Sequence, residues 1–433
     1  MIRHSLLRLS FLLLLLLSAP LVRGNALDEY VKAPDEKYSW KILSTFKTNS
    51  LEITSLELTS QGWHDTTWKH ILLIVKPEKI TNPEKAFLFI TGDGNGLGYV
   101  PMLAQIAQSG GTIAAVLNSV PNQPLLNNLK EDALIAYTFE QYMKTGDKTW
   151  PVLFPMVKSA VKAMDCLQEF AAKEQNLKIE KFVVAGASKR GWTTWLTAAV
   201  DKRVIAIAPM VIDMLNMKVQ TEWSQKAYGK QSDQIRDYTE RGLIGQMDHP
   251  RMVELRSFVD PYSYRDQYTL PKLLLLGTND PYWTVDSLRH YWSDLPGSKV
   301  VFQTPNAGHD LGDKKQAIQT LSAWYEMICL NESIPEVSWV FATKDGKPTV
   351  QIKSSQPYQK ISLWTANSSD RDFRNDHWTA IEQQPSGKLQ QEIFIPSPSD
   401  NYEAYLVEIE LRTPKGQVYK LSTEARVTPD DLK

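Results

Sequence analysis

The stretch that decides the fold is KFVVAGASKRG, residues 181–191, in which an uncharged run leads into a serine flanked by Gly186 and Gly191. Residues 182–186 carry no charge and no long polar side chain, which is typical of a strand buried on both faces of a parallel sheet. Ser188 follows where the chain leaves that strand. A serine on a tight turn from a strand into a helix projects its hydroxyl beyond the sheet edge, where reactive groups collect in open α/β folds.

Further apolar runs surround this stretch and alternate with helix-like segments. Strands are expected at 86–90, 112–117, 203–212, 272–277 and 299–304, and helices at 99–109, 152–176, 190–200, 285–294 and 315–330. Strands separated by helices at this rhythm predict a doubly wound, mostly parallel α/β sheet. Two longer stretches, 50–61 and 68–77, predict an antiparallel pair that leads into it.

The chain predicts two domains. Residues 25–334 contain the α/β pattern, with a long insertion at about 214–270 that is best explained as a helical cap over the sheet edge. Helical periodicity disappears after residue 335, and short alternating strands separated by turns follow. Residues 335–433 therefore predict a small all-β sandwich of the immunoglobulin or fibronectin type.

The first 24 residues predict a cleaved signal peptide. Basic residues precede an apolar run from Leu9 to Leu17, and small or medium residues lie ahead of a cleavage point near Gly24. The run is shorter than the roughly 20 residues of a membrane span, so no stable span is expected. The predicted location of the mature chain is therefore outside the cytoplasm, either secreted or periplasmic.

Composition excludes several classes of protein. The balance of 48 basic against 49 acidic residues provides no electrostatic attraction to nucleic acid. Only Cys166 and Cys329 are present, which excludes a disulfide scaffold, and their predicted helices would cover opposite faces of the sheet. No cluster of histidine and cysteine has metal-ligand spacing, so no metal or cofactor is implied.

The residues that could activate Ser188 come after it in a known order. A serine hydroxyl is a poor nucleophile until a base takes its proton and a third group orients that base. Asp280 lies just beyond the strand at 272–277, and His309 lies in a loop just beyond the strand at 299–304. Serine, acid and histidine, each following its own strand, is the order of the α/β-hydrolase triad.

The identity of the acid stays open at this point. Asp213 follows the strand at 203–212 and is a real alternative to Asp280. Asp286 lies a few residues downstream of Asp280, where it could act either as the acid or as a cap on the following helix. We favour Asp280 of the three.

Acyl transfer also needs donors for the oxyanion that forms in the transition state. One expected donor is the backbone N–H of Lys189, the residue after the nucleophile, and the other comes from the glycine-rich loop TGDGNGLG, with Gly94 and Asn95 as candidates. A phosphate-binding loop is the competing interpretation, but the run lacks the lysine and the spacing of such loops.

Four long motifs carry a resemblance to a known family. GASKRGWTTWL, DPYSYRD, PKLLLLGTNDPYWTVDS and PNAGHDL together resemble the PhoPQ-activated pathogenicity-related protein family, as does DRDFRNDHW at 370–378. The family includes a secreted proliferation repressor of amoebae. The resemblance implies an exported protein with a hydrolase-type fold, a C-terminal β domain and an association with virulence or defence.

A weaker similarity is to glucuronoyl esterases, which also place a basic residue directly after the nucleophile. Lys189 occupies that position, and bulky Arg190 stands where the common GxSxG turn has a glycine. Arg190 is therefore a candidate for substrate binding or for an ion pair. Tyr282, Trp283 and Trp223 are candidates for an aromatic-lined cleft that would suit a small molecule, a glycan or a peptide.

Two functions of different classes remain. The first is an exported serine hydrolase, of esterase or amidase type, that uses Ser188, His309 and Asp280. The second is a catalytically silent hydrolase-fold protein that binds or signals through its β domain to a protein partner. They differ in whether Ser188 is chemically activated.

Overall fold

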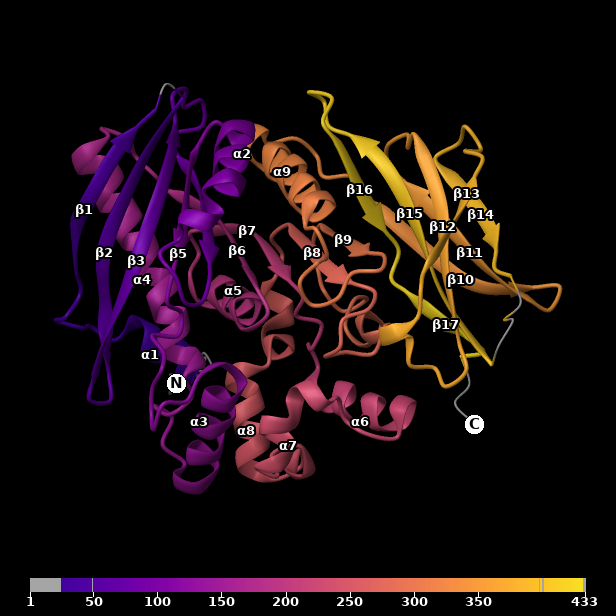
Figure 1. The fold of residues 1–433 in the computed structure, drawn as a ribbon, viewed down its shortest axis with the longest axis horizontal. Coiled ribbons are helices and arrows are strands. Elements are labelled where there is room, and N and C mark those ends of the chain that lie inside the picture. Colours follow the sequence, from indigo (N-terminus) through magenta and orange to yellow (C-terminus); the bar gives the residue numbers. More distant parts are fainter. Residues whose placement is uncertain (1–24, 49, 397, 399–400, 431–433) are drawn as a thin grey trace, which may run out of the picture.

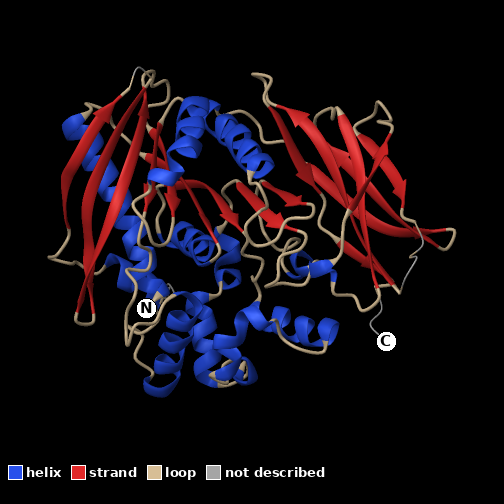
Figure 2. Ribbon diagram, in the orientation of Figure 1, coloured by secondary structure: helices blue, strands red, loops and turns tan. Residues whose placement is uncertain are grey.

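The computed structural model describes residues 25–48, 50–396, 398 and 401–430. The predicted signal peptide lies outside the described residues. A central sheet with helices on both faces is followed by a second body made of antiparallel strands, as Figures 1 and 2 show. The predicted α/β-hydrolase-like sheet with a helical insertion and a C-terminal β domain is thus confirmed.

The central sheet has nine strands in the order β1-β2-β3-β5-β4-β6-β7-β8-β9. Its strands β4 to β9 run parallel to their neighbours within that group, while β1, β2 and β3 pair antiparallel. Strand β5 precedes β4 in this order. Without the extra edge strand β1, this is the strand order of the α/β-hydrolase fold. The strands are β1 (Ser39–Lys47), β2 (Leu51–Trp63), β3 (Thr66–Pro77), β4 (Lys85–Ile90), β5 (Ile113–Leu117), β6 (Lys181–Ala187), β7 (Val204–Met210), β8 (Lys272–Gly277) and β9 (Lys299–Thr304).

Helices cover both faces of this sheet, which explains why its central strands are apolar throughout. Leu88 and Val184 belong to one hydrophobic core, whereas Phe87 and Val183, their neighbours in sequence, belong to the other. The first core is covered by α1 (Ala26–Lys32), α3 (Glu131–Thr145), α4 (Leu153–Glu174) and α5 (Lys189–Val200), and the second by α2 (Val100–Gly110) and α9 (Lys315–Leu330). Cys166 on α4 and Cys329 on α9 thus face different cores, and both are free.

The insertion between β7 and β8 forms a cap of short helices. It contains α6 (Met217–Tyr228), α7 (Arg236–Glu240), α8 (Pro250–Val259) and three 3₁₀ turns, η2 (Asp233–Ile235), η3 (Ile244–Gln246) and η4 (Pro261–Gln267). These helices lie together with α3 on one side of the molecule, at the bottom of Figure 1. We call residues 214–270 the cap insertion from here on.

The C-terminal body is a sandwich of two antiparallel sheets, and its core is continuous with that of the α/β part. Strand β16 packs beside α9 and β9, and the side chains of Phe302, Trp324 and Leu421 belong to one cluster. One sheet contains β10 (Val337–Lys344), β11 (Lys347–Ser354) and β14 (Gln390–Phe394), and the other contains β12 (Lys360–Ser368), β13 (Thr379–Gln383), β15 (Tyr402–Arg412), β16 (Val418–Ser422) and β17 (Arg426–Thr428).

Two local expectations differ from the structure, and some of its elements were not expected. The helix predicted at 285–294 is wrong, because only the single 3₁₀ turn η5 (Ser287–His290) forms there. The strand predicted at 203–212 ends at Met210. Helix α3 and the edge strand β1 have no counterpart among the predicted elements.

Candidate active site

The turn that carries Ser188 is strained in the way expected of an exposed nucleophile. Ser188 has φ 56° and ψ −125°, between the end of β6 and the first residue of α5. Residues other than glycine rarely adopt this backbone conformation, so the surrounding structure must hold Ser188 in it. The backbone N–H of Ser188 donates to the carbonyl of Met210 on the neighbouring strand, at 2.9 Å.

The two flanking glycines are required by close backbone approach. A Cβ on Gly186 would lie 2.6 Å from the carbonyl oxygen of Arg190, and one on Gly191 would lie 2.7 Å from the Ile212 side chain. Gly191, one position later than the second glycine of the common GxSxG turn, therefore lets α5 pack onto the sheet. This spacing leaves room for the Arg190 side chain within the turn.

Ser188, His309 and Asp280 form a continuous hydrogen-bonded chain. Nε2 of His309 lies 2.8 Å from Oγ of Ser188, and Nδ1 of His309 lies 2.8 Å from Oδ2 of Asp280. The other carboxylate oxygen of Asp280 accepts the backbone N–H of Tyr282 at 2.9 Å, which fixes its orientation. The structure thus brings together the three residues that the sequence selects.

The two alternative acids bind elsewhere. Oδ1 of Asp213 accepts the hydroxyl of Tyr291 at 2.6 Å, and complete burial, reinforced by nearby carboxylates, raises the pKa of Asp213 to about 8. Asp286 does not cap a helix, because its side chain contacts Arg371, Arg289 and Trp223. Burial alone would raise the pKa of Asp286, but the Arg371 guanidinium, together with Trp223 and Arg289, outweighs burial and lowers this pKa to about 2.

The loop after β4 lies beside Ser188 because β4 and β6 are parallel neighbours. Ile90 pairs with Gly186, so both chains leave the sheet at the same level. Gly94 (φ 131°) and Gly96 (φ 82°) hold the loop in left-handed conformations that favour glycine. As the first residue of α5, Lys189 presents a backbone N–H for which the helix has no acceptor. The expected oxyanion donors Lys189, Gly94 and Asn95 thus come from two adjoining segments.

Arg190 braces this loop. Its side chain is buried and donates through both terminal nitrogens to Glu131 at 2.7 Å and through Nε to the carbonyl of Val120. A Cβ on Gly92 would lie 2.5 Å from the Arg190 guanidinium, so the loop after β4 lies directly against it. Of the two roles that the sequence leaves open for Arg190, this geometry matches the ion pair.

Lys189 turns to the other side and joins a polar cluster of four residues. Its Nζ lies 2.5 Å from Oδ2 of Asp132 and 3.2 Å from the hydroxyl of Tyr282. Asp132 also accepts the hydroxyls of Tyr282 and Tyr238, at 3.1 and 3.0 Å. Burial alone would lower the pKa of Lys189, but the Asp132 carboxylate outweighs it and raises this pKa, so the ammonium stays charged.

Tyr282 links this cluster to the histidine. Its ring lies against the imidazole of His309, with ring centroids 4.2 Å apart and an interplanar angle of 30°. The Lys189 ammonium lies over the same tyrosine ring, 5.2 Å from its centroid. The imidazole is therefore held by Asp280 at one nitrogen and by an aromatic face.

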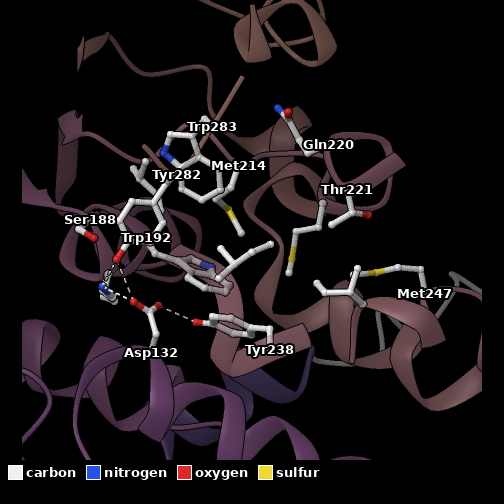
Figure 3. A pocket seen from close by; sticks show the side chains of 15 residues that line it. Asp132, Ser188, Trp192, Met214, Gln220, Thr221, Tyr238, Met247, Tyr282 and Trp283 are labelled. Carbon is white, nitrogen blue, oxygen red and sulfur yellow. Dashed lines mark hydrogen bonds and ion pairs between the residues drawn. The ribbon is translucent and has the colours of Figure 1, made fainter. Parts of the chain in front are cut away.

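A pocket opens beside Ser188, between α5 and the cap insertion (Figure 3). Its empty volume is about 610 Å³, which includes the space at its mouth that is open to solvent. Its lining residues come from α3, α5, the cap insertion and the loop after β8, and they are Asp132, Ser188, Lys189, Trp192, Ile212, Met214, Met217, Gln220, Thr221, Ile235, Tyr238, Ile244, Met247, Tyr282 and Trp283.

The predicted aromatic candidates divide between two places. Tyr282 and Trp283 line the pocket, but Trp223 does not, because its Nε1 donates to Asp286 at 3.0 Å on another side of the cap insertion. Sequence reasoning missed Asp132, which also lines the pocket. The acidic pair Glu131–Asp132 matches the basic pair Lys189–Arg190, and that match is the one signal that could have indicated Asp132.

The C-terminal domain clamps the loops that carry Asp280 and His309. Nδ2 of Asn279 donates to the carbonyls of Phe373, Arg374 and Asp376, at 3.1, 3.3 and 2.8 Å. Asn306 and the backbone of Trp378 exchange two hydrogen bonds, of 2.9 and 2.7 Å. We call residues 370–378 the clamp segment. It supports the residue before the acid and the start of the histidine loop.

The part of the chain that the structure describes contains neither a metal-binding cluster nor a membrane-spanning helix. Within residues 25–430 as far as they are described, no group of three or more histidine, cysteine, aspartate or glutamate side chains could hold a metal ion. In the same part of the chain, no helix has the length and apolar character needed to cross a membrane.

Comparison with known proteins places this architecture in a family. The model of the PhoPQ-activated pathogenicity-related proteins matches residues 27–374, from α1 to the clamp segment. The chain belongs to the PhoPQ-activated pathogenicity-related family. A relative from Dictyostelium discoideum, autocrine proliferation repressor protein A, is 32% identical over 470 aligned positions, which cover 98% of this chain and 94% of the relative.

Solved structures similar to this family member include esterases. Acetyl xylan esterase 1 from Thermoanaerobacterium is 15% identical with a TM-score of 0.49, and the match covers 70% of this chain and 91% of that one. An S-formylglutathione hydrolase from Agrobacterium tumefaciens is 11% identical with a TM-score of 0.46, covering 66% and 98%. The assignment of the fold rests on the strand order of the central sheet.

Proposed function

We propose that the protein is an exported serine hydrolase that cleaves a carboxylic ester or amide. One observation carries the proposal: Ser188, on a strained turn, is hydrogen-bonded to a histidine whose other nitrogen is bonded to a carboxylate. This is the arrangement that converts a serine hydroxyl into a nucleophile.

The reaction follows from this geometry. Oγ of Ser188 attacks the substrate carbonyl carbon while Nε2 of His309 takes the hydroxyl proton, and Asp280 stabilises the imidazolium. The oxyanion accepts the N–H of Lys189 and an N–H from the loop at Gly94 and Asn95. His309 then gives its proton to the departing alcohol or amine. A water molecule, activated by the same imidazole, releases the acyl group from Ser188 and restores the enzyme.

Export predicts that the mature chain begins near Asn25. Asn25, the residue after the expected cleavage point, caps α1 by accepting the N–H of Leu27, and its Nδ2 donates to the carbonyl of Ser257. A mature chain that begins at residue 25 would keep both contacts. N-terminal sequencing of protein recovered from the culture medium or periplasm should begin near residue 25, and an intact Met1 on exported protein would contradict the proposal.

Covalent labelling tests whether Ser188 is activated. A fluorophosphonate probe should add once per molecule to the wild type, and mass spectrometry should place the adduct on Ser188. Ser188→Ala and His309→Ala should abolish labelling, whereas Ser293→Ala, at an exposed serine, should label like the wild type. Absence of labelling on folded wild-type protein would favour the alternative, a catalytically silent protein that binds or signals through its β domain.

A second comparison tests the acid. Asp280→Asn should lower kcat on the order of 10³- to 10⁴-fold, because the amide no longer holds the imidazole in the required state. Asp213→Asn is the matched control, since Asp213 is buried nearby but bonded to Tyr291. Equal losses in the two variants would argue against the role assigned to Asp280.

A further inference from the structure

The pocket beside Ser188 has walls built almost entirely from hydrocarbon and thioether groups. Its apolar lining side chains are Trp192, Ile212, Met214, Met217, Ile235, Ile244, Met247 and Trp283. Five of these, Met214, Met217, Ile235, Ile244 and Met247, belong to the cap insertion. Burial of apolar surface is therefore the main favourable contribution that this pocket offers to a ligand.

The charges in the pocket already neutralise each other. Asp132 and Lys189 are the acidic and basic residues among those that line it, and they are paired at 2.5 Å. Both neighbouring tyrosine hydroxyls donate to the same carboxylate. An ionised substrate group entering the pocket would lose its water without gaining an unpaired opposite charge, which is costly. The pocket therefore favours an uncharged group.

Most of the other polar groups in the lining already have partners, although the buried Nε1 of Trp283 has none among the described residues. Nε2 of Gln220 donates to the carbonyls of Leu215 and Ser287, and Oγ1 of Thr221 donates to the carbonyl of Lys218. A sugar ring places several hydroxyls on its surface, and each would need a partner when buried. The walls described here are poorly matched to such a ring.

The shape and the residue types fit a linear chain. In Figure 3 the pocket extends from Ser188 and Tyr282, past Met214, to Met247 at the far end. Three methionines line it, and their unbranched, flexible side chains adjust to a chain with many rotamers.

From these observations we propose that the pocket binds an uncharged, unbranched aliphatic chain, so that the preferred substrates are neutral esters with several carbons on one side of the scissile bond. This inference rests on the proposed function, since the chain would be part of the substrate attacked by Ser188. It assigns a substrate class that differs from acetylated sugars and from uronate esters.

Chain-length selectivity tests the inference. The probes are 4-nitrophenyl esters with acyl chains of two to twelve carbons and n-alkyl acetates with alcohols of the same lengths. In one of the two series, kcat/KM should rise about fourfold per added methylene until the pocket is full, which corresponds to about 0.8 kcal/mol for each buried methylene. The series that shows the rise identifies the side of the ester that occupies the pocket. No rise in either series would overturn the proposal.

A charged analogue tests the neutral character. A 4-nitrophenyl monoester of a dicarboxylic acid has the length of the best neutral chain but ends in a carboxylate. It should react at least 100-fold more slowly than the neutral ester. Equal or faster reaction of the carboxylate-ended ester would overturn the proposal.

A variant at the far end of the pocket links the selectivity to this site. Met247→Lys replaces a buried thioether with a cation of similar length and should lower the preference for long neutral chains over acetyl at least tenfold. Val253→Lys, at an exposed position of the same cap insertion, is the matched control and should keep the wild-type preference. An unchanged preference in folded Met247→Lys would place the chain elsewhere.

Binding without turnover separates this inference from the proposed function. Octyl acetate and methyl octanoate carry the chain on opposite sides of the ester. At least one of them should bind Ser188→Ala in calorimetry, and the same protein carrying Met247→Lys should bind it at least tenfold more weakly. Binding to Ser188→Ala without any hydrolysis by the wild type would overturn the proposed function but keep the pocket. Hydrolysis by the wild type without chain-length dependence would overturn the pocket and keep the function.

Discussion

Two adjacent basic residues and two adjacent acidic residues fix the surroundings of Ser188. Lys189 pairs with Asp132 and Arg190 pairs with Glu131, so the start of α5 is tied to the start of α3. The first pair lies at the pocket and the second lies behind the loop after β4. Because both cations are paired within the fold, neither offers an unpaired charge to an anionic substrate.

The stacking of Tyr282 on His309 gives a prediction at the residue scale. Tyr282→Ala should lower kcat more than tenfold with a smaller change in KM, because the imidazole loses its aromatic support. Tyr282→Phe keeps the ring but loses the bonds to Lys189 and Asp132, and should retain most of kcat. Steady-state kinetics with one ester substrate measures both effects. Equal losses in the two variants would show that the hydroxyl matters more than the ring.

Asp213 should make folding stability depend on pH. Its pKa is about 8 in the folded protein and near 3.8 in the unfolded chain, so the native state binds the proton more tightly. The stability contribution of this proton is fully present below pH 3.8 and is lost as pH rises through 8. Relative to Asp213→Asn, the wild type should therefore lose stability from pH 4 to 8, with a slope of up to about 1.4 kcal/mol per pH unit.

Urea unfolding of the two proteins at several pH values measures this slope. Asp260, whose pKa burial raises to about 6, is present in both proteins, so its contribution cancels in the difference. The amide oxygen introduced by Asp213→Asn can still accept the hydroxyl of Tyr291, which keeps the variant close to the native packing. Parallel stability curves would show that Asp213 is ionised in the folded state.

At the scale of elements, the clamp segment gives a second prediction. Asn279→Ala removes the donor of three backbone carbonyls and should cost about 2 kcal/mol of stability, together with a loss of kcat as the Asp280 loop loosens. Asn375→Ala, at an exposed residue of the same segment, is the control and should change neither quantity. Thermal unfolding and kinetics on the same preparations make the comparison. Full activity of folded Asn279→Ala would show that the clamp does not position the acid.

The sequence predicts the elements whose pattern is local and misses those fixed by distant contacts. The parallel strands were predictable because burial on both faces demands apolar runs, and the order of Ser188, Asp280 and His309 follows from the ends of those strands. The helix expected at 285–294 fails because Asp286 is held by Arg371 of the β domain. The contacts of Asn279 reach backbone carbonyls almost a hundred residues away, which no side-chain pattern indicates.

At the scale of the whole molecule, the two domains share one hydrophobic core. Phe302 of β9 and Trp324 of α9 belong to the same buried cluster as Val407 and Leu421 of the sandwich. Hydrogen bonds between Gln303 and Ala425 and between Thr320 and Lys420 cross the same boundary. Removing the sandwich would expose these apolar side chains to water.

This continuity predicts a single unfolding transition. Calorimetry should show one peak, with calorimetric and van't Hoff enthalpies that agree, although the chain has two bodies. A chain that ends at residue 334 should fail to form the native α/β body and should aggregate. Two resolved transitions, or an active truncated protein, would contradict the shared core.

The clamp segment lies late in the chain, which affects when the site can be assembled during synthesis. Ser188, Asp280 and His309 all emerge from the ribosome before residues 370–378, which hold two of their loops. Strand β16, which seals the shared core, follows later still. On the proposed function, a growing chain that already contains Ser188, Asp280 and His309 would therefore remain inactive until residues 370–378 and β16 have been made.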